Sequence, residues 1–175
     1  MKAVVIYKTK YGTTKQYAEW IAEALEIPLF EATAIKPAQL LDYDVIIYGG
    51  GLYAGGVIGS KLVAENPCNC LILFTVGAAD PSTTDYKDIL EKNFSQDLLS
   101  KTKIFHLRGG IDYSKLSLVH KGMMAMLRKM VKKKSKKSES ELSDEDMLFL
   151  ETYGKKVDFM DKTTIMPLVD YVQTL

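Results

Sequence analysis

A short apolar segment near the start of the chain runs directly into a hydroxyl-rich turn and then into a helix. Lys2–Tyr7 is rich in β-branched and aromatic residues, as is typical of a strand, and Thr14–Glu26 carries apolar residues at helical spacing. The first amides of such a helix lack an intrahelical partner, and the helix dipole places partial positive charge there. The turn is therefore either a helix cap or a site for an anion such as a phosphate.

The turn offers mainly neutral hydrogen-bond donors. Its hydroxyl groups can donate to a phosphate, and a glycine lets the backbone approach the anion closely. Neither the nucleotide-hydrolase pattern G-x-x-x-x-G-K-[ST] nor the dinucleotide pattern G-x-G-x-x-G occurs. Neutral donors suit a cofactor that stays bound better than they suit phosphoryl transfer. The candidate binding residues of the turn are Thr9, Lys10, Tyr11, Gly12, Thr13 and Thr14.

Four more strand-like segments follow, and most are separated by helical ones. We expect strands at Pro28–Thr33, Tyr43–Tyr48, Cys70–Val76 and Lys103–Leu107, and helices at Val57–Ala64, within Asp80–Leu99 and at Thr163–Thr174. Strands that alternate with helices indicate right-handed crossovers and a parallel sheet. The sequence thus predicts an α/β fold, a doubly wound five-stranded parallel sheet in the order 2-1-3-4-5. Its ligand site is expected at the switch point between the first and third strands.

Two further loops are expected at that edge of the sheet. Gly49–Gly56 holds five glycines and follows the third strand, and Thr75–Asp80 follows the fourth. Glycines allow a flat ring to approach the backbone, and Tyr53 could stack on that ring; the alternative is a hairpin-like surface loop with an exposed tyrosine. The candidate binding residues of these loops are Gly51, Leu52, Tyr53, Ala54, Thr75, Val76, Gly77 and Ala78. We expect no catalytic residue set and no metal site, and we interpret His106 as a core imidazole.

Residues 112–161 exceed what such a fold needs, so we expect a helical insertion after the fifth strand of a single domain, 1–175. Helices are expected at Leu116–Lys134 and Asp144–Thr152, with a charged, mobile connection over Lys132–Asp146. Of the 23 basic residues, eight lie in Lys121–Lys137, which leaves 15 against 22 acidic ones in the remainder. A basic, Met-rich helix can pack on its own domain, bind an acidic protein, or make peripheral membrane contact through residues 116–137.

The composition is that of a globular protein, with 47% hydrophobic and 26% charged residues. No apolar run approaches the ~20 residues of a membrane span, and Met1 leads straight into a strand, so we expect no signal peptide. A cytoplasmic location follows, with membrane association on the cytoplasmic face as an option. Cys68 and Cys70 are expected to be free thiols. We expect no nucleic-acid partner, and the oligomeric state is open.

The opening segment resembles the flavodoxin signature. The matching positions are Val5, Ile6, Tyr7, Thr9, Gly12, Thr14, Ala18 and Ile21. The resemblance implies an FMN phosphate in the turn Thr9–Thr14, a flavin ring on Tyr53, and backbone amides of Thr75–Asp80 at the pyrimidine edge. It also implies electron transfer to a redox partner protein or a quinone. A binding module that uses the same fold without flavin stays open as an alternative.

The layout of nearly the whole chain is similar to the flavodoxin-domain family that includes the menaquinone-dependent protoporphyrinogen dehydrogenases. Gly109–Tyr113 and the helix after it lie where that enzyme has its insertion. The enzyme's loop is rich in arginine and aromatic residues, whereas this chain has Ser114, Lys115 and Ser117. A quinone-dependent protoporphyrinogen dehydrogenase is therefore an alternative function that the resemblance implies.

Overall fold

The computed structural model describes residues 1–137 and 142–175, which form two compact units. The first, here called the sheet unit, comprises residues 1–109 and 160–175, and the second, the insertion unit, comprises residues 110–159. The single domain, 1–175, with an insertion at residues 112–161 stays a prediction.

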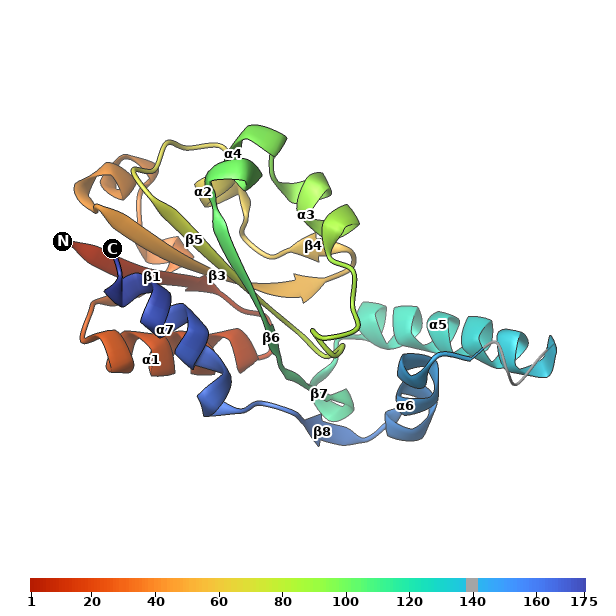
Figure 1. Ribbon diagram of the computed structural model, residues 1–175. Coiled ribbons are helices and arrows are strands. Elements are labelled where there is room, and N and C mark those ends of the chain that lie inside the picture. Colours follow the sequence, from red (N-terminus) through yellow and green to blue (C-terminus); the bar gives the residue numbers. More distant parts are fainter. Residues whose placement is uncertain (138–141) are drawn as a thin grey trace. The chain divides into compact units, whose positions relative to one another are not determined.

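Five parallel strands in the order β2-β1-β3-β5-β6 form the main sheet of the sheet unit (Figure 1). This confirms the predicted doubly wound order, 2-1-3-4-5, when the parallel strands alone are numbered. β1 lies between β2 and β3, and its Tyr7 lies opposite Glu31 on one side and Gly49 on the other. The strands are β1 (Ala3–Lys8), β2 (Leu29–Glu31), β3 (Val45–Tyr53), β5 (Leu71–Gly77) and β6 (Lys103–Arg108), with the short β4 (Gly56–Val57) antiparallel to β3.

Helices cover both faces of this sheet (Figure 1). α1 (Thr13–Leu25) and α7 (Met166–Gln173) pack on one face, and α2 (Lys61–Ala64), α3 (Lys87–Asn93) and α4 (Gln96–Lys101) lie on the other. Alternate residues of β1 enter the two cores, with Val5 on the α1 side and Ile6 on the opposite side. Because both faces are buried, the central strands are apolar at consecutive positions rather than alternating.

The glycine-rich stretch Gly49–Gly56 was expected to be a loop, and this was wrong for its first half. β3 continues to Tyr53, because the backbone stays paired on both sides, with Gly50 opposite Lys8 and Thr75. Ala54 and Gly55 then turn the chain back into β4, with φ of 51° and 75°. Positive φ at both central residues is the geometry of a tight hairpin turn. The hairpin also shortens the helix expected at Val57–Ala64 to α2.

Three other expected boundaries shift. The single helix expected within Asp80–Leu99 is two helices, because the chain is extended at Phe94 and Ser95, where the Ser95 hydroxyl caps α4. The strand expected at Pro28–Thr33 shortens to β2, since a 3₁₀ turn, Ala32–Ala34, follows it. At the C-terminus a 3₁₀ turn, Lys162–Ile165, precedes α7. The apolar face expected there is buried, as predicted, and consists of Ile165, Leu168, Val169 and Val172.

The insertion unit contains two helices and a two-stranded antiparallel ribbon. Its elements are β7 (Gly110–Asp112), a 3₁₀ turn (Tyr113–Lys115), α5 (Leu118–Lys137), α6 (Asp144–Thr152) and β8 (Lys156–Asp158). The mobile connection expected from Lys132 onward was wrong as far as Lys137, which still belongs to α5. Its residues 138–141 lie outside the described residues. Within the described ranges, no helix is long and apolar enough to cross a bilayer.

Candidate cofactor site

The turn after β1 leaves the N-terminus of α1 without a side-chain cap. Gly12 is the N-cap residue, with φ 97° and ψ −19°, and it has no side chain that could bond to the helix. Thr9 closes the turn instead, since its Oγ1 accepts a hydrogen bond from the Gly12 amide at 3.0 Å. The Gln16 amide donates to the Gly12 carbonyl at 3.1 Å, so the amides of Thr13 to Lys15 precede the helical ladder. This is the geometry of a helix-terminal anion site.

Lysines close to the turn contact other groups of the protein. Lys8 Nζ lies 2.7 Å from Glu31 Oε1, and this hydrogen bond lowers the pKa of Glu31. Lys15 Nζ is 3.6 Å from Glu19 Oε1, and the Lys10 ammonium lies 3.7 Å from the centre of the Tyr53 ring. The arrangement supports the prediction from the sequence that an anion here would be held mainly by amides and hydroxyl groups.

The ends of β1, β3 and β5 meet beside this turn. Thr14 is buried, and a Cβ placed on Gly51 would lie 3.0 Å from its Oγ1. Gly51 in turn pairs with Val76, and a Cβ on Gly77 would lie 3.0 Å from the Leu52 side chain. The lack of side chains at these glycines therefore lets three separate stretches approach one another. The predicted switch point of the sheet lies here.

Tyr53 stands at the tip of the β3–β4 hairpin and joins the hairpin to the first turn. Its ring is half-buried, and the Lys10 ammonium that lies over it comes from the turn after β1. The neighbouring Ala54 is exposed and has a positive φ, which costs a residue with a side chain about 1 kcal/mol or more. The side chain of Ala78 is also exposed, so Ala54 and Ala78 offer backbone groups rather than buried contacts.

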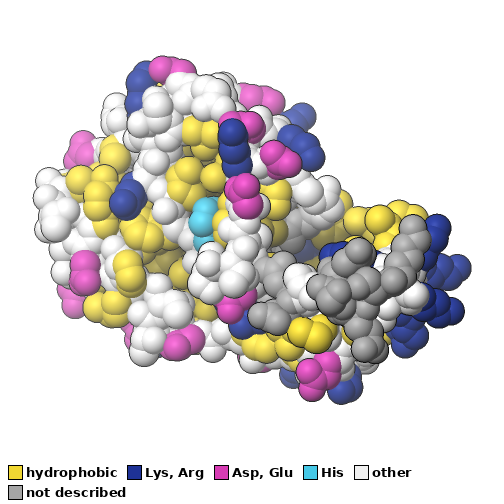
Figure 2. All heavy atoms as spheres, turned by 45° about the vertical axis from the view of Figure 1, so that its right-hand side comes forward, with side chains coloured by type: hydrophobic (Ala, Val, Ile, Leu, Met, Phe, Trp, Pro, Cys, Tyr) yellow, Lys and Arg dark blue, Asp and Glu magenta, His cyan; other side chains and the backbone are white. Residues whose placement is uncertain are grey.

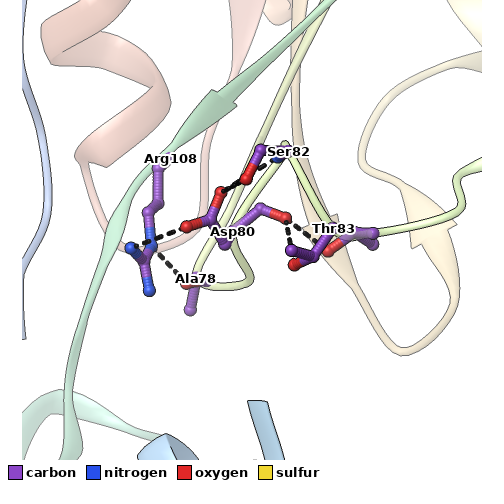
Figure 3. Close-up of polar contacts among 6 residues, drawn as sticks. Ala78, Asp80, Ser82, Thr83 and Arg108 are labelled. Atoms are coloured by element: carbon purple, nitrogen blue, oxygen red, sulfur yellow. Dashed lines mark hydrogen bonds and ion pairs between the residues drawn. The ribbon is translucent and has the colours of Figure 1, made fainter. Parts of the chain in front are cut away.

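Arg108 was missed by the sequence interpretation, and it holds the loop that follows β5 (Figure 3). Its Nε donates a hydrogen bond to the Ala78 carbonyl at 3.3 Å, and its Nη1 lies 3.4 Å from Asp80 Oδ2. Asp80 also accepts hydrogen bonds from the Ser82 hydroxyl and amide, and these bonds, with the Arg108 charge, lower its pKa. The signal in the sequence was a basic residue directly after an apolar strand, at the edge where the loops converge.

The Thr75 side chain points into the core rather than toward an open loop. Its Oγ1 lies 2.6 Å from His106 Nδ1, and the His106 ring is stacked on Tyr86 with ring centres 3.6 Å apart. Burial lowers the pKa of His106 to about 4, so the imidazole is neutral at physiological pH. Tyr86 is 7% exposed, so this ring is part of the core. His106 itself is only partly buried, so the expectation of a core imidazole agrees with its stacking and its contact with Thr75 but not with full burial.

The residues present fit a phosphate-bearing flavin mononucleotide. The uncapped helix terminus suits the phosphate, the half-buried Tyr53 ring can face a flat group, and the loop held by Arg108 presents backbone at the end of β5. Among the residues that the structure describes, no group of three or more potential ligands is arranged to hold a metal ion. Fold and site together define a doubly wound α/β protein with the geometry of an anion site at its switch point.

The family model for the flavodoxin domain matches residues 4–138, and the chain belongs to the flavodoxin-domain family. This confirms FMN as the cofactor expected from the sequence, and it supports a role in electron transfer.

The chain is similar to several solved structures. A flavodoxin, WrbA-like protein from Agrobacterium tumefaciens shares 27% identity over 56% of this chain and 69% of that chain, with a TM-score of 0.41. Oxidised flavodoxin 2 from Bacillus cereus shares 19% over 62% of this chain and 84% of that chain, with a TM-score of 0.47. Rubredoxin oxygen:oxidoreductase from Desulfovibrio gigas shares 13% identity over 61% of this chain and 29% of that chain, with a TM-score of 0.43. No curated protein matches the chain.

Proposed function

We propose that this protein binds FMN noncovalently at the converging loops and exchanges electrons with a redox partner protein or a quinone. When bound, FMN supplies the redox chemistry. The observation that carries the proposal is the uncapped N-terminus of α1 beside the glycines of β3. The 14 residues proposed from the sequence, in the stretches 9–14, 51–54 and 75–78, are the proposed binding residues.

Each stretch has its own role in this proposal. The Thr13 and Thr14 amides and the Thr14 hydroxyl bind the phosphate. Tyr53 positions the ring system of the flavin on the hairpin side. There the flavin either displaces the Lys10 ammonium from the Tyr53 ring or contacts the same ammonium. On the other side the backbone of residues 75–78 meets the pyrimidine edge, and Arg108 keeps that loop in place.

Titration with FMN and with riboflavin tests the proposal, because the two ligands differ only in the phosphate. We expect FMN to bind tightly with a quenched flavin fluorescence, and riboflavin to bind more weakly. Equal affinity for both ligands would contradict a phosphate site at α1. A protein that binds neither ligand would instead be a flavin-free binding module on this fold.

A specific observation in the insertion unit favours quinone-dependent oxidation of protoporphyrinogen as a second candidate. The Arg128 guanidinium lies 4.5 Å from the centre of the Tyr153 ring, which also contacts the rings of Tyr113 and Phe149. Within the described residues, the buried Arg128 Nε has no hydrogen-bond partner. An arginine among aromatic rings can bind a flat substrate that carries carboxylates.

Turnover of protoporphyrinogen with a menaquinone acceptor tests this candidate. Loss of turnover in Arg128→Gln, with FMN affinity unchanged, would support it. A wild-type protein that holds FMN but does not oxidise protoporphyrinogen would leave simple electron transfer as the function.

A further inference from the structure

Helix α5 presents three different faces around its axis. At about 100° per residue, Met124, Arg128 and Val131 share one side, and this side is the least exposed part of the helix. Arg128 contacts Tyr153 there, so this side packs against other residues of the insertion unit. Lys134, which pairs with Asp146 of α6 at 2.8 Å, lies one turn beyond Met130 and outside this side.

A second side consists of exposed apolar residues, which we call the apolar face. Its members and their exposed fractions are Val119 (70%), Met123 (38%), Met126 (64%), Leu127 (43%) and Met130 (61%). They recur at i, i+4, i+7, i+8 and i+11, so they form one continuous stripe. Isolated exposed apolar residues are ordinary, but a continuous stripe on one helix marks a binding surface.

The third side carries exposed lysines and borders the apolar face, and we call it the basic face. Its members are Lys121, Lys129, Lys132, Lys133 and Lys136. No acidic residue occurs between Lys121 and Lys137 in the sequence. Figure 2 shows lysine side chains gathered around the C-terminal part of α5, with hydrophobic side chains beside them. The partner of this surface must therefore be anionic next to an apolar region.

The chemistry of the two faces distinguishes between the candidate partners. A second copy pairing through α5 would bring two lysine-rich surfaces together, which is unfavourable. Protein interfaces are depleted in lysine, whereas the face that borders the apolar stripe consists of lysines, and the stripe itself contains no aromatic ring. A helix with an aliphatic side and a lysine-rich side matches the interfacial helices that lie in the plane of a bilayer.

We propose that α5 is a peripheral membrane anchor that binds anionic lipid surfaces. The apolar face enters the boundary between headgroups and acyl chains, and the lysines of the basic face extend to the phosphate groups. The helix lies on the membrane and does not cross it, in keeping with its low apolar content. This proposal goes beyond electron transfer, because it depends on α5 alone and on no residue of the flavin site.

Co-sedimentation of the full-length FMN-loaded protein with vesicles tests the anchor. Vesicles of phosphatidylcholine alone are compared with vesicles that contain 30% phosphatidylglycerol (about a third anionic lipid, as on a cytoplasmic leaflet). We expect binding to the anionic vesicles only, and a decrease of at least tenfold when NaCl is raised about tenfold, because salt screens the lysine charges.

Two sets of variants separate charge from apolar insertion. Lys129→Gln, Lys132→Gln and Lys133→Gln together should weaken binding by about 100-fold, a factor of roughly five per lysine. The matched control is Lys36→Gln, Lys61→Gln and Lys87→Gln, exposed lysines of the sheet unit whose replacement changes the net charge equally. Met126→Gln with Met130→Gln, which leaves the net charge unchanged, should also weaken binding at least tenfold, while Leu41→Gln, at a site with 51% exposure, should not.

Several outcomes would overturn the proposal. Protein that stays in the supernatant with anionic vesicles at low salt does not bind lipid through α5. Equal loss of binding in the α5 variant and in the control lysine variant would indicate general charge attraction. A dimer in solution that Met126→Asp dissociates would assign the apolar face to a second copy. Titration with FMN should give the same affinity in all variants, so failure of the anchor and failure of the flavin site are distinguishable.

Discussion

His106 should make the sheet unit less stable as the pH falls below 6.5. The neutral ring is stacked on Tyr86 and bonded to Thr75, and burial lowers its pKa from 6.5 to about 4. Because the folded state binds the proton less readily than the unfolded state, the stabilisation is complete above pH 6.5. It is lost progressively as the pH falls from 6.5 toward 4.

The magnitude follows from the two pKa values. This lowering of the pKa makes the unfolding free energy ~3.4 kcal/mol smaller below pH 4 than at neutral pH. Between pH 7.5 and pH 5 the unfolding free energy falls by ~2 kcal/mol. The ring is only partly buried, so screening by solvent reduces the second figure to about 1–2 kcal/mol. The carboxylates with lowered pKa values, such as Glu31, also lose stabilisation in acid. Their contribution must therefore be removed by comparison with a variant.

His106→Phe is the variant, because phenylalanine can stack on Tyr86 and does not titrate. Removing the partner of the Thr75 hydroxyl costs about 1–3 kcal/mol at every pH. Urea unfolding of flavin-free protein, followed by the fluorescence of the single tryptophan, Trp20, reports on the sheet unit. The difference in unfolding free energy between wild type and variant should shrink by about 1–2 kcal/mol from pH 7.5 to pH 5. Parallel pH profiles would refute the buried, neutral imidazole.

Four further predictions concern the cofactor site and its turn. Thr14→Val should weaken FMN binding by ~1–3 kcal/mol and leave riboflavin binding unchanged in fluorescence titrations, because only the phosphate loses a hydrogen-bond donor. Equal weakening of FMN and riboflavin binding would argue against a phosphate site. Arg108→Gln should weaken the binding of FMN and of riboflavin by similar factors, smaller than the effect of Thr14→Val on FMN. The unfolding free energy should change by less than about 1 kcal/mol, since the ion pair with Asp80 is partly exposed. Weaker binding of FMN alone would contradict this role of Arg108. In Tyr53→Ala the fluorescence of bound flavin should rise, and unchanged fluorescence and affinity would remove Tyr53 from the site. Gly12→Ala should lower the unfolding free energy by ~1–2 kcal/mol because of its positive φ, whereas Gly122→Ala in α5 should raise helix stability by up to ~1 kcal/mol; circular dichroism during urea unfolding checks both, and equal effects would contradict a conformational cause.

The strands of the sheet could be predicted from the sequence because each strand is recognisable from its own run of residues. Runs such as Tyr43–Tyr48 and Cys70–Val76 are apolar at consecutive positions, which indicates strands covered on both faces. A hairpin-like loop was one of the two alternatives for Gly49–Gly56, but the continuation of β3 through the glycines was missed for an equally local reason, because a run of glycines suggests a loop when its neighbours are unknown. Those glycines are in fact strand residues that lack side chains because Phe74 and Val57 occupy the space where a Cβ would lie.

The contacts that shape the site could not be predicted, because they join residues distant in sequence. Arg108 reaches Ala78 and Asp80 across 30 and 28 positions, and His106 reaches Thr75 across 31. Thr75 and His106 are register partners on β5 and β6, and Ala78 and Asp80 lie in the loop directly after Gly77, the register partner of Arg108. These contacts therefore depend on the strand order and the register together. Once β5 and β6 are known to be neighbours and their register is known, the residue opposite each polar side chain can be identified.

The length of α5 shows where composition was a poor guide. The lysine-rich run from Lys132 was interpreted as a mobile connection because it is charged and of low complexity, yet the helix continues to Lys137. Lysine is a good helix former, and the Lys134–Asp146 ion pair together with buried Val131 holds the last turns in place. This extension matters for function, because it places Lys132, Lys133 and Lys136 at defined positions beside the apolar face. A mobile segment would carry the same charge without that arrangement. A loss of vesicle binding in Met126→Gln with Met130→Gln, in which every charge is unchanged, would therefore require the apolar face of the helix itself.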